Sequence, residues 1–163
     1  MKKPSITTVI SVGIIVFFVA FIGYLIQRPD PRTTMTSREL LADCTTDMAT
    51  QYHIHPNLKV VVSGEVIDVP QNIGIDFTRN CMSALHTHES NGKIHVESPV
   101  KKDFTLGDFF YNWNEIFNKD QIFDYQVDAE HGIKMTVDGV ESKEFENLVF
   151  QDKQQIVIEY YKL

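Results

Sequence analysis

Histidines dominate the chemistry-bearing residues of this chain, and their spacing is regular. Five of the six histidines fall between residues 53 and 95. Two His-x-His pairs and a later His-x-Glu pair supply the candidate metal ligands: His53, His55, His86, His88, His95 and Glu97. Neutral imidazole binds divalent transition metals, and a carboxylate often completes the shell. These residue types at this spacing predict a copper or zinc site.

A tight turn at Asn91-Gly92 is expected to position the later histidines. Asn-Gly is the strongest short-range signal for a two-residue hairpin loop. Counting back from it places His88 opposite His95 and His86 opposite Glu97, all on one face because strand side chains alternate. The other face carries a set that suits a core: Leu85, Thr87, Ile94 and Val96. The alternative is an exposed polar face with three unrelated histidines.

The first His-x-His pair lies in a separate extended segment. His53 and His55 share one face of residues 52–56, since Pro56 disfavours helix at His55. If this segment neighbours the hairpin in a sheet, all five imidazoles converge on one site. The alternative is two histidines at a strand edge. His131 sits in a turn far along the chain and is predicted to be a surface residue.

The strands and the helix expected to position these residues indicate an α+β domain. Residues 58–62 and 66–70 read as paired strands, and residues 155–160 as a closing strand. A helix begins after its cap at Thr105 and carries an apolar stripe that extends to Phe117. This order predicts a β-grasp-like mixed sheet with one packed helix and a His-rich hairpin insertion. The ending looks like that of ubiquitin-like and sulfur-carrier-like proteins, a likeness that indicates no chemistry.

The N-terminal stretch is apolar. Residues 6–26 carry no charge, which is long enough to span a bilayer. We therefore predict a single-pass transmembrane anchor at residues 1–26, a linker at 27–35 and a His-rich domain at 36–163. A short basic N-terminus usually stays inside, so the domain is expected outside the cytoplasm. A cleaved signal peptide is the alternative.

The rest of the chain is acidic. All 22 acidic residues and 13 of the 15 basic ones follow residue 26, which leaves that part with a net charge of −9. No basic stripe is available for phosphates, so nucleic acid is excluded as an expected partner. An acidic surface favours the capture of cations.

The chain has two cysteines, Cys44 and Cys81. In an oxidising compartment they are expected to form a disulfide. Two buried thiols, or one thiolate acting as a metal ligand, are the alternatives that the sequence leaves open.

Four motifs in residues 52–161 together resemble a poorly characterised family of membrane-anchored exported microbial proteins. The motifs are His53–His55, Leu85–His88, Gly92–Pro99 and Phe104–Phe110 with Trp113. That family usually has an aspartate at the position of Glu89, so the acid is kept here. The resemblance implies that the histidine pairs act as one unit, and it implies no reaction. Cupins also use His-x-His, but they space the acid differently.

Three functions fit these patterns. The first is a metal-binding protein that carries, senses or delivers copper or zinc at a membrane surface. The second is a metal-dependent enzyme with a three-histidine site, in which Glu89 or Glu97 acts as a general base. The third is an accessory subunit of a membrane protein complex whose histidines are structural.

Overall fold

The chain divides into two compact units, Met1–Pro31 and Arg32–Leu163. The computed structural model describes residues 6–44 and 51–163. The first unit contains helix α1 (Ile6–Ile26), whose side chains are described over residues 13–25. The predicted boundaries at residues 26 and 35 lie on either side of the observed division.

The predicted transmembrane anchor is wrong. Among the described residues no helix combines the length and the apolar character that crossing a bilayer requires. The predicted membrane partner and the predicted single-pass location rested on residues 1–26 and find no support for the same reason. Residues 1–5 of that segment lie outside the described part.

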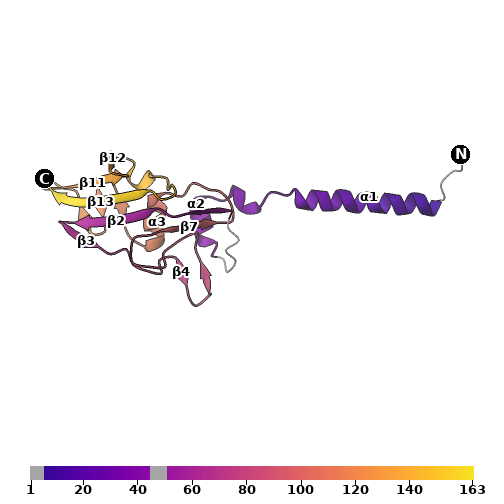
Figure 1. The fold of residues 1–163 in the computed structure, drawn as a ribbon, viewed down its shortest axis with the longest axis horizontal. Coiled ribbons are helices and arrows are strands. Elements are labelled where there is room, and N and C mark those ends of the chain that lie inside the picture. Colours follow the sequence, from indigo (N-terminus) through magenta and orange to yellow (C-terminus); the bar gives the residue numbers. More distant parts are fainter. Residues whose placement is uncertain (1–5, 45–50) are drawn as a thin grey trace. The chain divides into compact units, whose positions relative to one another are not determined.

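The second unit is mixed α+β and mostly sheet. Its largest sheet has the order β12-β11-β13-β2-β3, in which β13 is parallel to β2 and the other pairs are antiparallel. Figure 1 shows β11, β13 and β2 side by side. The strands are β2 (Asn57–Val62), β3 (Glu65–Ile67), β11 (His131–Val137), β12 (Val140–Ser142) and β13 (Gln155–Lys162).

The remaining elements are short. A second sheet has the order β1-β7-β6, formed by β1 (Tyr52–Ile54), β7 (His95–Ser98) and β6 (Leu85–His86). The others are η1 (Pro31–Thr34), β4 (Ile75–Asp76), β5 (Cys81–Met82), β8 (Phe117–Asn118), β9 (Gln121–Ile122), β10 (Tyr125–Gln126) and η2 (Phe145–Asn147). The second sheet carries the histidines.

Two capped helices support these sheets. In α3 (Leu106–Trp113) the Thr105 side chain accepts from the Asp108 amide and the Asp108 side chain accepts from the Thr105 amide, as the sequence predicts. The helix ends at Trp113 and is followed by its cap Asn114 in a left-handed conformation, so the predicted helical stripe stops before Phe117. In α2 (Ser37–Ala42) Thr36 and Glu39 form the same kind of cap.

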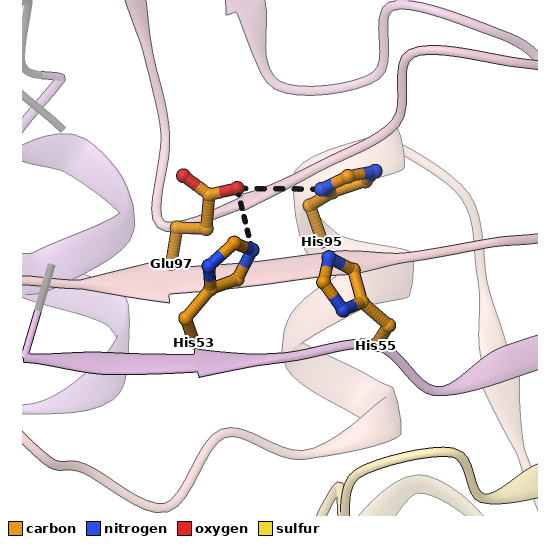
Figure 2. Close-up of side chains that lie close together, drawn as sticks. All are labelled: His53, His55, His95 and Glu97. Carbon is orange, nitrogen blue, oxygen red and sulfur yellow. Dashed lines mark hydrogen bonds and ion pairs between the residues drawn. The ribbon is translucent and has the colours of Figure 1, made fainter.

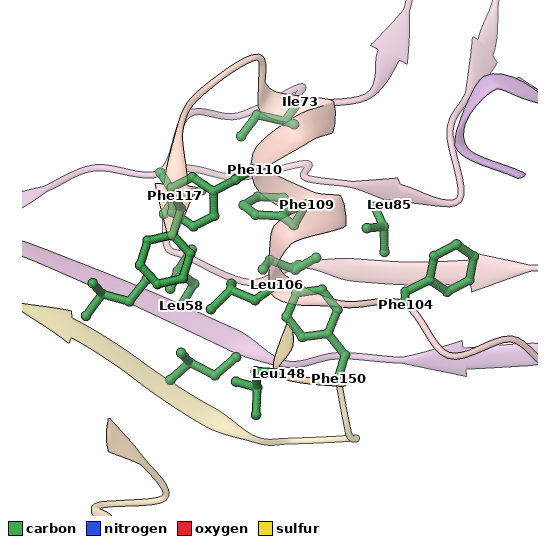
Figure 3. Close-up of a cluster of buried hydrophobic side chains, with 14 of the residues drawn as sticks. Leu58, Ile73, Leu85, Phe104, Leu106, Phe109, Phe110, Phe117, Leu148 and Phe150 are labelled. Carbon is green, nitrogen blue, oxygen red and sulfur yellow. The ribbon is translucent and has the colours of Figure 1, made fainter. Parts of the chain in front are cut away.

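One hydrophobic core joins α3 to both sheets. Phe109, Phe110 and Leu106 are fully buried on one face of the helix. Figure 3 shows them against side chains from the strands and from the segment before β13. Those neighbours include Leu58, Leu85, Leu148 and Phe150. Each such side chain contributes roughly 1.5–3 kcal/mol on burial.

The hairpin register differs from the prediction by two residues. His86 pairs with His95 and Leu85 with Val96, so the connection is longer than a two-residue turn. Two competing pairings explain this. The Gly92 carbonyl accepts from the Leu58 amide at 2.8 Å, and Ile94 donates to Pro56. On the other side the Thr87 amide donates to the Ile73 carbonyl at 3.1 Å. A register shift of two residues leaves every side chain on the same face of the sheet.

Gly92 is where this loop meets the large sheet. Its φ is +81°, and a Cβ there would lie 2.1 Å from the Leu58 carbonyl oxygen. We expect Gly92→Ala to lower the free energy of unfolding by about 2–4 kcal/mol, because it adds a clash to left-handed strain. Gly139→Ala is the matched control, since Gly139 has φ +82° and open space around it. Urea unfolding of both variants is the measurement, and equal losses would contradict the clash.

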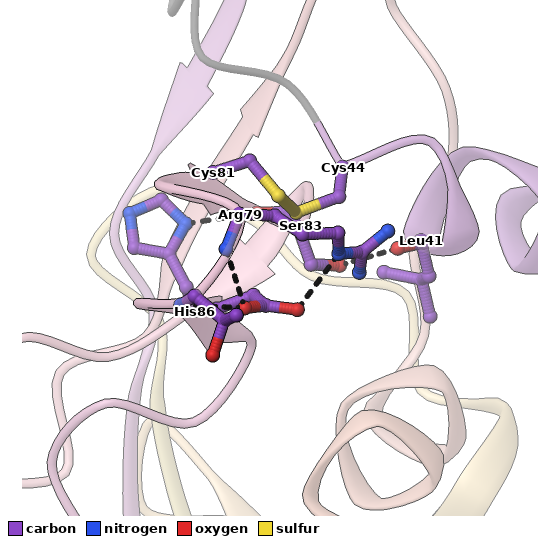
Figure 4. The surroundings of a disulfide bond; sticks show 8 residues. Leu41, Cys44, Arg79, Cys81, Ser83 and His86 are labelled. Atoms are coloured by element: carbon purple, nitrogen blue, oxygen red, sulfur yellow. Dashed lines mark hydrogen bonds and ion pairs between the residues drawn. A yellow bond between two sulfur atoms is a disulfide. The ribbon is translucent and has the colours of Figure 1, made fainter.

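The predicted disulfide is confirmed. Cys44 follows α2, Cys81 begins β5, and their Cα atoms are 5.5 Å apart. Figure 4 shows this bridge beside Ser83, whose hydroxyl donates to the Leu41 carbonyl at 2.9 Å. Bonds of this kind persist in oxidising environments. Because both cysteines of the chain are in this bridge, neither is a thiolate that could bind a metal.

Candidate metal centre

The second sheet brings the two histidine segments together. Its central strand β7 pairs with β1, where His53 lies opposite Glu97, and with β6, where His86 lies opposite His95. Because side chains alternate along a strand, these residues project from one face. The opposite face carries Leu85 and Val96, both fully buried in the core. The side chains on this face of β7 therefore lie beside histidines from both neighbouring strands.

The first group of candidate ligands, here called the outer group, consists of His53, His55, His95 and Glu97. Its donor atoms all lie within 4.8 Å of one another. Figure 2 shows the Glu97 Oε1 atom between two imidazoles, 2.9 Å from His53 Nε2 and 3.3 Å from His95 Nδ1. His55 packs against both rings, at centroid distances of 4.5 Å from His53 and 4.6 Å from His95.

The second group, here the inner group, consists of His86, His88 and His95. The three ring centroids lie 4.7–5.2 Å apart. His86 is completely buried, whereas His88 is exposed. His95 belongs to both groups, so the structure places all six predicted ligands in one continuous cluster.

The buried His86 ring has one nitrogen engaged and one without a partner. Its Nδ1 lies 3.0 Å from the Ser83 carbonyl oxygen. A carbonyl only accepts, so Nδ1 donates and carries the proton of the neutral ring. Among the described residues nothing hydrogen-bonds to His86 Nε2. This nitrogen faces Glu97 Oε1 at 4.0 Å, so two acceptors point at each other, an arrangement that suits a cation between them.

The surroundings of the cluster keep several of its imidazoles neutral. Burial lowers the pKa of His86 to about 4. Burial is also the main cause that lowers the pKa of His95 and of His55, and neighbouring histidines add to it. Since a metal binds the neutral ring, His55, His86 and His95 stay available as ligands below pH 6.5.

The same pKa shift predicts how the metal-free protein responds to acid. Because the folded-state pKa of His86 lies below its unfolded value near 6.5, the unfolded chain takes up the proton first. The contribution of neutral His86 to the free energy of unfolding is therefore fully present above pH 6.5. It falls by up to about 3 kcal/mol as the pH drops toward 4. Urea unfolding of the metal-free protein across this range measures it. His86→Leu should flatten the profile, and an unchanged slope in that variant would refute the assignment.

The cluster is open to solvent on one side. A hollow of about 500 Å³ reaches His53 and His55. Its other walls are Asn57, Lys93, Asp152, Lys153 and Gln155. His88 gives the inner group its own exposed member. An ion could therefore reach either group without the fold having to open.

The structure also places residues that the sequence left outside the site. His131 pairs with Asp128 at 3.0 Å and stacks on Tyr160, and it belongs to neither metal-ligand group, as predicted. Ser83 was not predicted, although its carbonyl fixes the His86 tautomer. No side-chain signal could reveal this role, because the backbone performs it. Glu89 contacts Asn91 in the loop rather than the cluster.

Comparison with known proteins finds no match. No protein-family model matches the chain, no curated protein matches its sequence, and no solved structure matches it. The resemblance to membrane-anchored exported microbial proteins therefore stays a prediction from four motifs. The described residues do contain histidine and glutamate groups that could hold a metal ion.

Proposed function

We propose that this protein binds copper or zinc ions at the histidine cluster and serves in their carriage, sensing or delivery. The observation that carries this proposal is His86 Nε2, a fully buried nitrogen with a free lone pair and no partner among the described residues. Leaving such an atom unpaired costs about 1–3 kcal/mol. A metal ion bound at His86 Nε2 removes that cost.

The second support is the donor set around this atom. Imidazole with carboxylate suits Zn(II) and Cu(II), whereas Cu(I) prefers the softer sulfur of Cys and Met. The cysteines are tied up in the disulfide, and the cluster is formed by histidines and one glutamate. The Ser83 carbonyl holds His86 in the required tautomer, as the outer partners of metal-bound histidines commonly do.

The proposal is tested by titrating the metal-free protein with Zn(II) and with Cu(II) in a calorimeter. We expect saturable binding of at least one of the two metals, and elemental analysis of the protein purified without a His tag should find that metal. His131→Ala should bind as the native chain does, since His131 lies outside the cluster. Absence of saturable binding would leave the histidines with a structural role, as in an accessory subunit.

A further inference from the structure

The six ligands exceed what one ion takes. Zinc in proteins is almost always four-coordinate, with bonds of about 2.0–2.2 Å to nitrogen and oxygen. Within the outer group and within the inner group all donor atoms lie within 4.8 Å of one another. Across the groups the rings are further apart: within the described residues, no ring contact joins His53 or His55 to His86 or His88. The imidazoles therefore fall into two shells, and Glu97, whose Oε1 atom lies 4.0 Å from His86 Nε2, stands at the boundary between them.

The two shells meet at the central strand. His95 is the residue that both groups contain, and it has two ring nitrogens. His95 Nδ1 lies on the side of Glu97, at 3.3 Å from its Oε1 atom. The rings of His55 and His88 both stand edge-on to the His95 ring, at 4.6 Å and 4.7 Å. A member of each shell thus contacts the same imidazole.

We propose that the cluster is a two-ion centre in which His95 bridges the metals. One ion is held by His53, His55 and Glu97, and the other by His86 and His88, each with one nitrogen of His95. This rests on the proposed function and specifies the number of ions and their shared ligand. The neutral His95 ring binds the first ion through its unprotonated nitrogen and must then lose its one N–H proton, which is released to solvent as the second ion binds. The net charge of −9 after residue 26 favours the entry of two dications.

Sheet architecture is the physical reason for such a centre. A central strand has two neighbours, so its side chains on one face can be shared between ligands from both sides. Here β1 and the residue after it supply His53 and His55 of the outer group, and β6 with its following loop supplies His86 and His88 of the inner group. Each shell also has one well-exposed histidine, His53 or His88, which lets its ion exchange independently.

The experiment counts ions in the full metal-free chain. Calorimetry with Zn(II) should give two equivalents for the native chain and for His131→Ala. It should give one equivalent for the His53→Ala/His55→Ala double variant and one for His88→Ala. All four positions carry exposed or half-buried side chains, and circular dichroism should show native folding. One equivalent in the native chain would overturn the two-ion centre and leave the proposed function standing, whereas no binding would overturn both.

Electron paramagnetic resonance tests the bridge. With two equivalents of Cu(II), two ions joined through one imidazole should couple magnetically, and the signal should fall below that of two isolated ions. His88→Ala loaded with Cu(II) should show the full signal of one isolated ion. Two equivalents of Cu(II) with an uncoupled signal would overturn the bridging role of His95.

Discussion

Replacing His95 with alanine should weaken metal binding by at least about 100-fold. Loss of a residue that merely supports a ligand already costs 10–100-fold, and His95 belongs to both ligand groups. The effect should exceed that of His55→Ala or His88→Ala, since each of those residues belongs to one group. This ranking holds whichever group binds more tightly.

Competition with a chromophoric chelator measures these affinities for Zn(II). His131→Ala is the matched control, because His131 is a half-buried histidine paired with an acid, as His95 is, but lies outside the cluster. If the His95→Ala variant binds Zn(II) as tightly as the His131→Ala variant does, the centre does not depend on the shared residue.

Loss of the disulfide should have the largest effect on stability. Cys44 and Cys81 are 37 residues apart in sequence. In the chain-entropy model, opening a loop of this size lowers the free energy of unfolding by about 3–4 kcal/mol. The Cys44→Ser/Cys81→Ser double variant should show this loss in urea unfolding of the metal-free protein, with a lower midpoint and a similar slope.

Chemical reduction of the native chain provides the control for that variant. Reduced native protein and the double variant should have matching midpoints, because both lack the same constraint. If the unfolding midpoint of the native chain does not shift under reducing conditions, the bridge adds little to stability. The disulfide also lies close to the site, since Ser83 is two residues from Cys81 and its carbonyl fixes His86. Added Zn(II) should therefore recover part of the stability lost, by mass action on the folded state.

The sequence alone determined the features that depend on near neighbours. Both helix caps join residues three apart, Thr36 with Glu39 and Thr105 with Asp108, so their hydrogen bonds were predictable from spacing. The alternation of a strand likewise placed His86 on the same face as His88 and His95 with Glu97, whatever the register. The six candidate ligands were predicted on this basis, and the two cysteines indicated their bridge.

Tertiary structure decided the partners of each strand and the depth of each side chain. The hairpin register shifted because Gly92 pairs with Leu58 and Thr87 with Ile73, contacts between segments far apart in sequence. The pairing of β1 with β7, which unites the histidine segments, is of the same kind. The burial of His86, which leaves its Nε2 atom without a partner in the described part of the chain, results from packing around it. Spacing in a sequence records no such contacts, because they depend on which distant segments share one core.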